Sequence, residues 1–418
     1  MTPPPPANRL PPVFARLAGA NLAAQSAEQV SLAAVPLVAV LALGAGPGEI
    51  GLLATAQTLP FLLLSIPTGL LADRVSKRRL MGVGEALRLL AFVGLLAAGA
   101  LGALSIPLLA LLGFLGATGT VAFSVAAPAL VPTLVPRAAL ATANGRLELA
   151  RSAAFAAGPA LAGALVAWAG ATPAFVLAAV LSAAALVLLL ALPEPAPAAP
   201  VARRHPLVDL KEGAQLVWQH PLLRPVLLTA VVWNIAWFVL QAVYVPYAVR
   251  SLGLSAGAVG FTLSTYGAGM VLGALAAPWV LRALPFGHAV LLGPVVSVGA
   301  MLVMVATLRA PPAAGPALAA LSFFLFGAGP IIWTISSTTL RQTVTPAALL
   351  GRVTAIFLAV NMGARPLGAA LGGWLGASFG EGACLLLALL GFVLQAGVIG
   401  ASAVRRLHSL PVAAAAAS

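Results

Sequence analysis

Long apolar runs follow one another along almost the whole chain, and each is about as long as a helix that crosses a bilayer. Such a helix needs about 20 mostly apolar residues. Short turns rich in Gly, Pro, Arg or Ser separate the runs. The pattern predicts an all-α membrane protein with twelve transmembrane helices, at residues 14–43, 48–72, 80–101, 106–134, 142–169, 172–193, 223–250, 257–281, 288–308, 315–340, 350–377 and 381–404.

One connection, residues 194–222, is much longer than the others. It starts within "PEPAPAAP", a stiff extended spacer, and continues as "LVDLKEGAQLVWQH". Apolar positions in the second stretch fall near helical spacing: Leu207, Leu210, Ala214, Val217 and Trp218. This spacing predicts an amphipathic helix at the membrane interface. The alternative is an ordinary solvated linker helix.

The two halves of the chain resemble each other. "GEIGLL" from Gly48 matches "GAVGFT" from Gly257, and the segments from Asn144 and Leu350 match in the same order. Six spans on each side of the linker predict two six-helix bundles related by pseudo-two-fold symmetry. The expected organisation is a disordered tail at 1–13, bundles at 14–193 and 223–404 around the linker 194–222, and a second tail at 405–418.

Composition and charge support the membrane assignment. Of the 418 residues, 61% are hydrophobic and only 7% are charged, which is too apolar for a soluble protein. The net charge of +13 would suggest nucleic acid in a soluble chain, but these basic residues lie beside apolar spans, so we expect no nucleic-acid partner. With the N-terminus inside, 17 of the 22 Lys and Arg residues are cytoplasmic, which predicts both termini in the cytoplasm.

Features of the common enzyme and cofactor sites are missing from the sequence. The single cysteine, Cys384, excludes an intrachain disulfide and a cysteine-rich metal site, and the four histidines have no ligand spacing. No Walker loop and no catalytic triad occur. We therefore expect neither an enzyme nor a bound metal or cofactor.

A charged segment interrupts the apolar pattern after the second span. It reads "GLLADRVSKRRL", from Gly69 to Leu80. It resembles the loop motif Gly-x-Leu-Ala-Asp-Arg-x-Gly-Arg-Lys of the major facilitator superfamily, a family of membrane transporters. The matching residues are Gly69, Leu71, Ala72, Asp73, Arg74, Lys77 and Arg78, whereas Ser76 stands where the family prefers glycine.

The resemblance implies a gating role for this motif. It places Asp73 at the N-terminus of the eleventh span, near Ala348 to Arg352, where the helix dipole attracts a carboxylate. Such a contact would latch the outward-open state, with Arg74 and Arg78 as ion-pair partners and Glu148 as a further acid. The alternative is a loop whose basic residues only keep it on the cytoplasmic side of the membrane. This alternative explains the basic residues but not Asp73.

Two further segments are similar to parts of the family. "GPALAG", from Gly158 through Pro159 to Gly163, resembles a packing element of family members that export, although Ala162 replaces a glycine. Generic small-residue packing is the alternative. "EGAQLVWQHPLLRPVL" is similar to the subgroup that includes the enterobactin exporter and macrolide efflux proteins.

Polar residues form stripes on the first and seventh spans. Asn21, Gln25 and Glu28 share one helical face. The equivalent stripe on the seventh span, together with residues on the tenth and eleventh, completes the predicted substrate cavity: Asn234, Trp237, Gln241, Tyr244, Trp333 and Arg365. The family resemblance implies that the first, fourth, seventh and tenth spans line such a cavity.

Glu28 is the candidate for proton coupling. It is the only acid near the middle of any span, so every other acid is expected to have easier access to water or to the interface. Arg365 is expected either to pair with Glu28 or to attract an anionic cargo. Glu85 with Arg88, and Glu148 with Arg151, have i,i+3 spacing and are predicted to form structural pairs. A structural ion pair is also the alternative for Glu28.

These residues predict a monomeric secondary transporter in the bacterial cytoplasmic membrane. Its expected activity is proton-coupled efflux, by antiport and alternating access, of a small, partly apolar organic molecule that is drug-like or siderophore-like. The mixture of aromatic and amide side chains favours such a cargo. The alternatives are uptake of a sugar or metabolite and, from another class, a non-transporting membrane scaffold or sensor.

Overall fold

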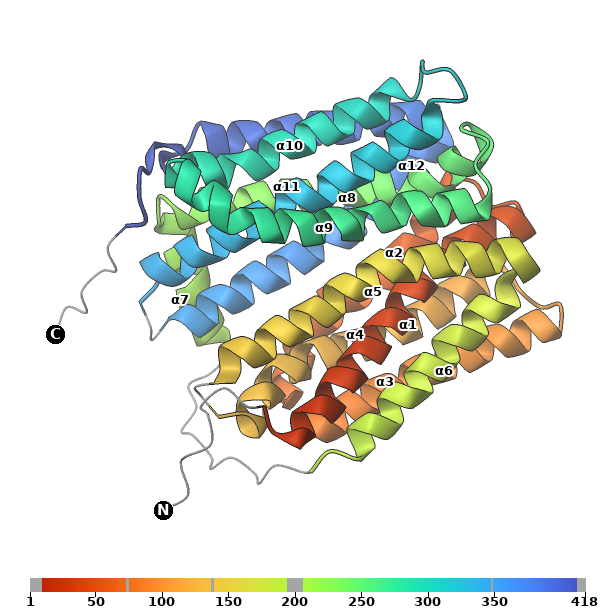
Figure 1. The fold of residues 1–418 in the computed structure, drawn as a ribbon, viewed down its shortest axis with the longest axis horizontal. Coiled ribbons are helices and arrows are strands. Elements are labelled where there is room, and N and C mark those ends of the chain that lie inside the picture. The colour runs from red at the N-terminus through yellow and green to blue at the C-terminus, as the bar shows by residue number, and fades with distance from the viewer. Residues whose placement is uncertain (1–9, 73–74, 137–138, 194–205, 347–348, 412–418) are drawn as a thin grey trace. The chain divides into compact units, whose positions relative to one another are not determined.

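The computed structural model describes residues 10–72, 75–136, 139–193, 206–346 and 349–411. In these ranges the regular structure is entirely helical (Figure 1). The elements are α1 (Pro12–Leu43), α2 (Pro47–Ala72), α3 (Lys77–Ala100), α4 (Ile106–Leu134), α5 (Leu140–Ala169), α6 (Ala171–Leu190), α7 (Pro206–Gln219), α8 (Leu223–Arg250), α9 (Ala256–Ala283), α10 (Phe286–Ala306), α11 (Gly315–Val344), α12 (Leu350–Gly400) and a short 3₁₀ turn, η2 (Ala403–Arg406).

Eleven of these helices are long and apolar enough to cross a membrane. The 51-residue α12 consists of two helices across a kink at Gly380, where φ is 81° and ψ is 171°. Glycine adopts this conformation without steric cost, whereas other residues rarely do. Each part of α12 is itself of spanning length, so the described residues hold the twelve apolar helical segments that the sequence predicts.

The chain divides into two compact units, which are described separately. The first contains residues 1–45, 56–199 and 255–264, and the second contains 46–55, 200–254 and 265–418. The first turns of α2 therefore group with the second unit, and those of α9 with the first. Within the second unit, a Cβ atom on Gly51 would lie 2.2 Å from the Cα of Gly373, so the two backbones are in direct contact.

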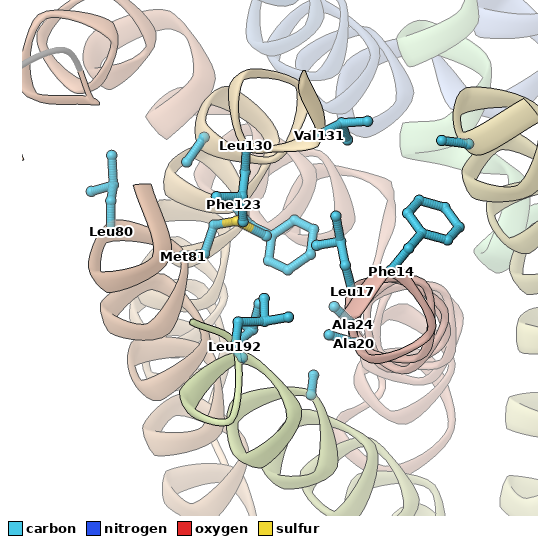
Figure 2. Packing of buried hydrophobic residues seen from close by; sticks show 14 of the residues in the cluster. Phe14, Leu17, Ala20, Ala24, Leu80, Met81, Phe123, Leu130, Val131 and Leu192 are labelled. Atoms are coloured by element: carbon cyan, nitrogen blue, oxygen red, sulfur yellow. The ribbon is translucent and has the colours of Figure 1, made fainter. Parts of the chain in front are cut away.

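In the first unit, α1 packs along α5 and α6, and α3 packs along α4 and α6. Large apolar side chains fill one end of this bundle. Leu17 of α1, Met81 of α3 and Phe123 of α4 lie together at its centre, as Figure 2 shows. Each is buried, and burial of such side chains is worth about 1.5–3 kcal/mol per residue in water.

In the second unit, α8 packs along α12, and α10 lies between α11 and α12. The predicted amphipathic helix is α7, which packs against the beginning of α12. Its Val217 is buried with Leu223 and Val353, whereas Trp218 is exposed. An apolar face covered by the helix bundle and an exposed aromatic residue agree with a helix at the interface.

Large apolar side chains also cover the outside of the helices. Trp168 of α5 is 79% exposed, Leu275 of α9 is 72% exposed, and many other Leu and Val residues are similar. Soluble monomers rarely expose so much continuous apolar surface. These faces match the hydrocarbon of a bilayer.

Candidate functional site

A buried polar cluster joins four helices of the first unit, with Arg88 of α3 at its centre. The Nη1 atom of Arg88 donates to the carbonyl oxygen of Ala24, at 2.9 Å, and to both carboxylate oxygens of Glu85, at 3.2 and 3.4 Å. Its Nη2 atom donates to Oγ1 of Thr120, at 2.8 Å. Ser182 of α6 donates to Oε1 of Glu85, at 2.7 Å. The cluster thus connects α1, α3, α4 and α6.

Glu85 is the most deeply buried acid of this cluster. Its side chain is 0% exposed and that of Arg88 is 3% exposed, so the predicted i,i+3 pair is confirmed and is sealed from solvent. In this structure Glu85 is less accessible to solvent than Glu28, whose side chain is 21% exposed. The glycines of α3 and α4 allow these two helices to pack closely, since a Cβ atom on Gly119 would lie 2.1 Å from the carbonyl oxygen of Gly84.

Glu28 lies at the edge of the same cluster. Its Oε2 atom is 3.9 Å from Nη2 of Arg88, and its side chain is 21% exposed. The separation is that of an ion pair without a direct hydrogen bond. The guanidinium of Arg88 therefore lies near two carboxylates. It is hydrogen-bonded to that of the buried Glu85, and it is 3.9 Å from that of the partly exposed Glu28.

The sequence did not predict that Arg88, Thr120 and Ser182 belong to the site around Glu28. The available signal was the charge on the third span, because ionisable residues inside a membrane are costly and usually have a role. The sequence favoured a purely local role for Glu85 and Arg88. The structure adds partners on three other helices.

The other residues of the α1 stripe lie on the side of α5. Asn21 is buried, and its side-chain nitrogen is 3.4 Å from the carbonyl oxygen of Leu147. Gln25 is half-buried between Asn21 and Glu28. Helices α1 and α5 approach closely at Gly158, where an added Cβ atom would lie only 2.4 Å from that of Gln29. Gly158 thus permits the approach of α5 to α1.

Pro159 and Gly163 continue the predicted packing motif along α5. Pro159 lies inside the helix, where it removes one backbone hydrogen bond. A Cβ atom on Gly163 would lie 2.8 Å from the Cα of Gly260, at the start of α9. Both glycines of the motif are therefore sites of close backbone approach.

In the second unit, the predicted cavity residues Asn234 and Arg365 are in contact. Nε of Arg365 donates to Oδ1 of Asn234 at 3.3 Å, and the guanidinium carbon lies 5.5 Å from the centre of the Phe238 ring. The amide of Asn234 donates in turn to the carbonyl oxygen of Ala230, at 2.9 Å. The cation is held by an amide and an aromatic face.

An aromatic cluster surrounds Trp237 of α8. Its ring is stacked on Trp233, with centroids 5.3 Å apart and planes at 12°, and it is tilted against Tyr266 at 5.2 Å. Phe323 and Phe326 of α11 meet it edge-on. Aromatic pairs of this kind add about 0.5–1.5 kcal/mol each to the burial term.

The remaining predicted cavity residues differ in exposure. Tyr244 is fully buried, with its ring 4.5 Å from that of Phe323, and exposes no surface to a cargo in this structure. Gln241 and Trp333 are half-buried. Within the described ranges, the buried Nε1 atom of Trp333 has no hydrogen-bond partner. That Tyr244, Gln241 and Trp333 bind the cargo stays a prediction.

The predicted gating motif is described only in part, since Asp73 and Arg74 lie outside the described residues. Gly69 is in the last turns of α2, and Lys77 is the first residue of α3. Arg78 donates to the carbonyl oxygens of Leu190 and Leu192, at 3.2 and 2.7 Å, and so caps the C-terminus of α6. The family's glycine position, Ser76, accepts from the backbone N–H of Arg79 as the N-cap of α3.

Two further ion pairs lie near the helix ends. Glu148 forms the predicted pair with Arg151 on α5, at 2.5 Å between Oε1 and Nη2, and this pair is exposed. Glu212 of α7 is paired with Arg352 near the start of α12. The second pair fastens the amphipathic helix to the helix whose N-terminus is the predicted partner of Asp73.

Comparison with known proteins gives a consistent result. The sequence profile of the Major Facilitator Superfamily matches residues 17–369. An uncharacterized MFS-type transporter, y4rN of Sinorhizobium fredii, is 29% identical over 380 residues, covering 88% of this chain and 89% of its own. The enterobactin exporter EntS of Escherichia coli is 29% identical over 315 residues, covering 74% and 72%.

Solved structures share the fold. The nucleoside transporter NupG superposes with a TM-score of 0.74 at 13% identity, covering 94% of this chain and 99% of that one. A bacterial homologue of the iron transporter ferroportin in its inward-facing state gives 0.73 at 17% identity, covering 93% and 97%. The chain belongs to the Major Facilitator Superfamily and is a multi-pass membrane transporter for a small molecule, not an enzyme.

Proposed function

We propose that the transporter exports a small, partly apolar organic molecule in exchange for protons, with Glu28 as the coupling carboxylate. The observation that carries this proposal is the position of Glu28. It lies 3.9 Å from Arg88 and is partly exposed, while the same guanidinium is hydrogen-bonded to the sealed Glu85. A proton on Glu28 removes the second negative charge from a cluster with one positive charge.

The difference between the two carboxylates supports Glu28, and not Glu85, as the carrier of the exchangeable proton. Glu85 accepts from Arg88 and Ser182, and breaking these bonds would leave buried polar groups unsatisfied. Glu28 can gain or lose a proton with a smaller loss of hydrogen bonds to this cluster. Proton binding and cargo binding on the face of α1 would then compete, which is the simplest basis for antiport.

The second unit supports the proposed cargo chemistry. The aromatic side chains around Trp237 suit an apolar ring, and Arg365 with Asn234 suits an anionic or hydrogen-bonding group. Sequence similarity to enterobactin exporters supports export and suggests a siderophore-like molecule. The solved neighbours, all below 25% identity, support the fold and do not indicate the direction of transport.

The proposed orientation places both termini in the cytoplasm, because most Lys and Arg residues then lie inside. Transport proceeds by alternating access of two symmetry-related bundles. The latch formed by Asp73 and the N-terminus of α12 closes the cytoplasmic side in the outward-open state. Glu148, in the early turns of α5, and Arg78, at the C-terminus of α6, support this side of the molecule.

Reconstituted vesicles test the proposal. With enterobactin as the first probe and an imposed proton gradient, the parent protein accumulates cargo, whereas Glu28→Gln loses gradient-driven accumulation and retains exchange of labelled for unlabelled cargo. Glu381→Gln is the matched control, because it makes the same change at a half-buried acid that accepts an exposed hydrogen bond from Ser251. If Glu28→Gln accumulates cargo as well as the control does, coupling through Glu28 is refuted.

A further inference from the structure

The C-terminal segment after α12 is fixed onto the beginning of α10. The backbone N–H of Phe286 donates to the carbonyl oxygen of His408, at 3.1 Å, and that of Gly287 donates to Leu407, at 2.8 Å. Val404 is fully buried, and its carbonyl oxygen would lie 2.3 Å from a Cβ atom on Gly287. The turn η2 and the residues after it therefore have a defined position on the helix bundle.

This arrangement forms a cavity of about 670 Å³ between the start of α10 and the end of α12. The basic residues among those that line it are two arginines and two histidines: Arg405, Arg406, His288 and His408. No carboxylate is among the lining residues. Such a volume is within the range of small-ligand sites, about 300–1,000 Å³.

The positive charge of the cavity is not balanced by the described part of the chain. In the ranges that the structure covers, no ion pair joins Arg405 or Arg406 to an acid. The first N–H groups of α10 are occupied by the carbonyl oxygens of Leu407 and His408. A ligand would therefore be held by the basic side chains, and it would have to be an anion.

The cavity lies where two apolar spans end. Gly400 is the last residue of α12, Phe286 is the first of α10, and both helices are long and apolar enough to cross a membrane. Exposed leucines flank the site along the chain, namely Leu284 and Leu410. Basic groups with apolar neighbours at the end of a span correspond to the headgroup level of a bilayer.

We infer that this cavity binds the phosphate headgroup of an anionic phospholipid. The two arginines supply forked donors that match phosphate oxygens, His288 and His408 add donors, and the exposed Leu284 and Leu410 offer apolar surface next to the site in the chain. Binding would hold the C-terminal turn, α10 and α12 together at the surface. The site is separate from the proposed transport residues, and its test does not depend on them.

The test measures phospholipid retained by the purified full chain. The protein is titrated in a non-ionic detergent with phosphatidylglycerol or with phosphatidylcholine, and bound lipid is counted by native mass spectrometry. The parent is expected to prefer phosphatidylglycerol. Arg405→Gln should weaken that binding about fivefold, and the Arg405→Gln/Arg406→Gln double variant should weaken it further. These arginines are exposed, so neither change should prevent folding.

Arg282→Gln is the matched control, since it removes one charge from an exposed arginine near the end of α9 that does not line the cavity. Equal binding of the two lipids by the parent, or equal losses in Arg405→Gln and Arg282→Gln, would overturn the inference. A separate arm adds millimolar inorganic phosphate. If phosphate alone displaces phosphatidylglycerol, the site takes a soluble anion and the lipid assignment is wrong.

Discussion

Replacing Arg88 by methionine should destabilise the first unit strongly. Glu85 would remain in a site that is 0% exposed, with Ser182 as the hydroxyl donor and without its guanidinium. Removing one partner of a buried ion pair typically costs about 3–5 kcal/mol, because a buried charge is left uncompensated. The hydrogen bonds to Ala24 and Thr120 would be lost as well.

The chain contains a matched exposed pair for comparison. Arg151 and Glu148 have the same residue types and the same i,i+3 spacing, but their side chains are 33% and 53% exposed. Solvent screens such a pair, so Arg151→Met should cost about 0.2–1 kcal/mol. The expected difference between the two variants is therefore at least about 2 kcal/mol, which is well above the error of an unfolding titration.

Unfolding by sodium dodecyl sulfate in mixed micelles, followed by circular dichroism, gives the free energies. A Glu85→Gln/Arg88→Met double variant should recover more than half of the loss, because it removes the uncompensated charge along with the arginine. Equal destabilisation by Arg88→Met and Arg151→Met would refute the view that burial makes the first pair structural. So would a double variant that is less stable than Arg88→Met.

Two further predictions concern local packing and pH. Gly158→Ala should cost about 1–3 kcal/mol, because its Cβ atom would lie 2.4 Å from that of Gln29, whereas Gly145→Ala on the same helix, with nothing within 4 Å, should be nearly neutral in thermal unfolding. Burial holds the pKa of His220 below its usual 6.5, and its Nδ1 accepts from the N–H of Leu222 at 3.1 Å. The folded-state pKa is below the unfolded one, so this stabilisation is present above about pH 6.5 and is lost as the pH falls through the folded-state pKa. His220→Gln should therefore lose less stability between about pH 8 and about pH 5 than the parent does, and an unchanged difference would contradict this assignment.

The sequence alone determined the number and position of the spans. The segments predicted at 350–377 and 381–404 are the two parts of α12, and Gly380 separates them. The amphipathic helix predicted in the linker is α7. These features depend on local patterns: the length of an apolar run, the helical spacing of its exceptions, and the residues that interrupt it. The boundaries were accurate to a few residues for the same reason.

The tertiary structure decided which polar groups meet. Sequence spacing gave the pair of Glu85 and Arg88, since three residues along a helix place them side by side. It gave no means of placing Thr120, Ser182 and Glu28 around this ion pair, because these residues come from three other helices. It also did not show that Glu85 is sealed, since burial depends on the neighbours packed over a helix and not on the depth of a residue within its span.

The C-terminal cavity also depends on tertiary contacts that the sequence did not reveal. The sequence marked 405–418 only as a tail after the last span. Its position on α10 depends on the two backbone hydrogen bonds from Phe286 and Gly287, and on the absence of a side chain at Gly287. A sequence pattern reports what one segment favours by itself, whereas contacts between distant segments depend on packing that is cooperative across the whole unit.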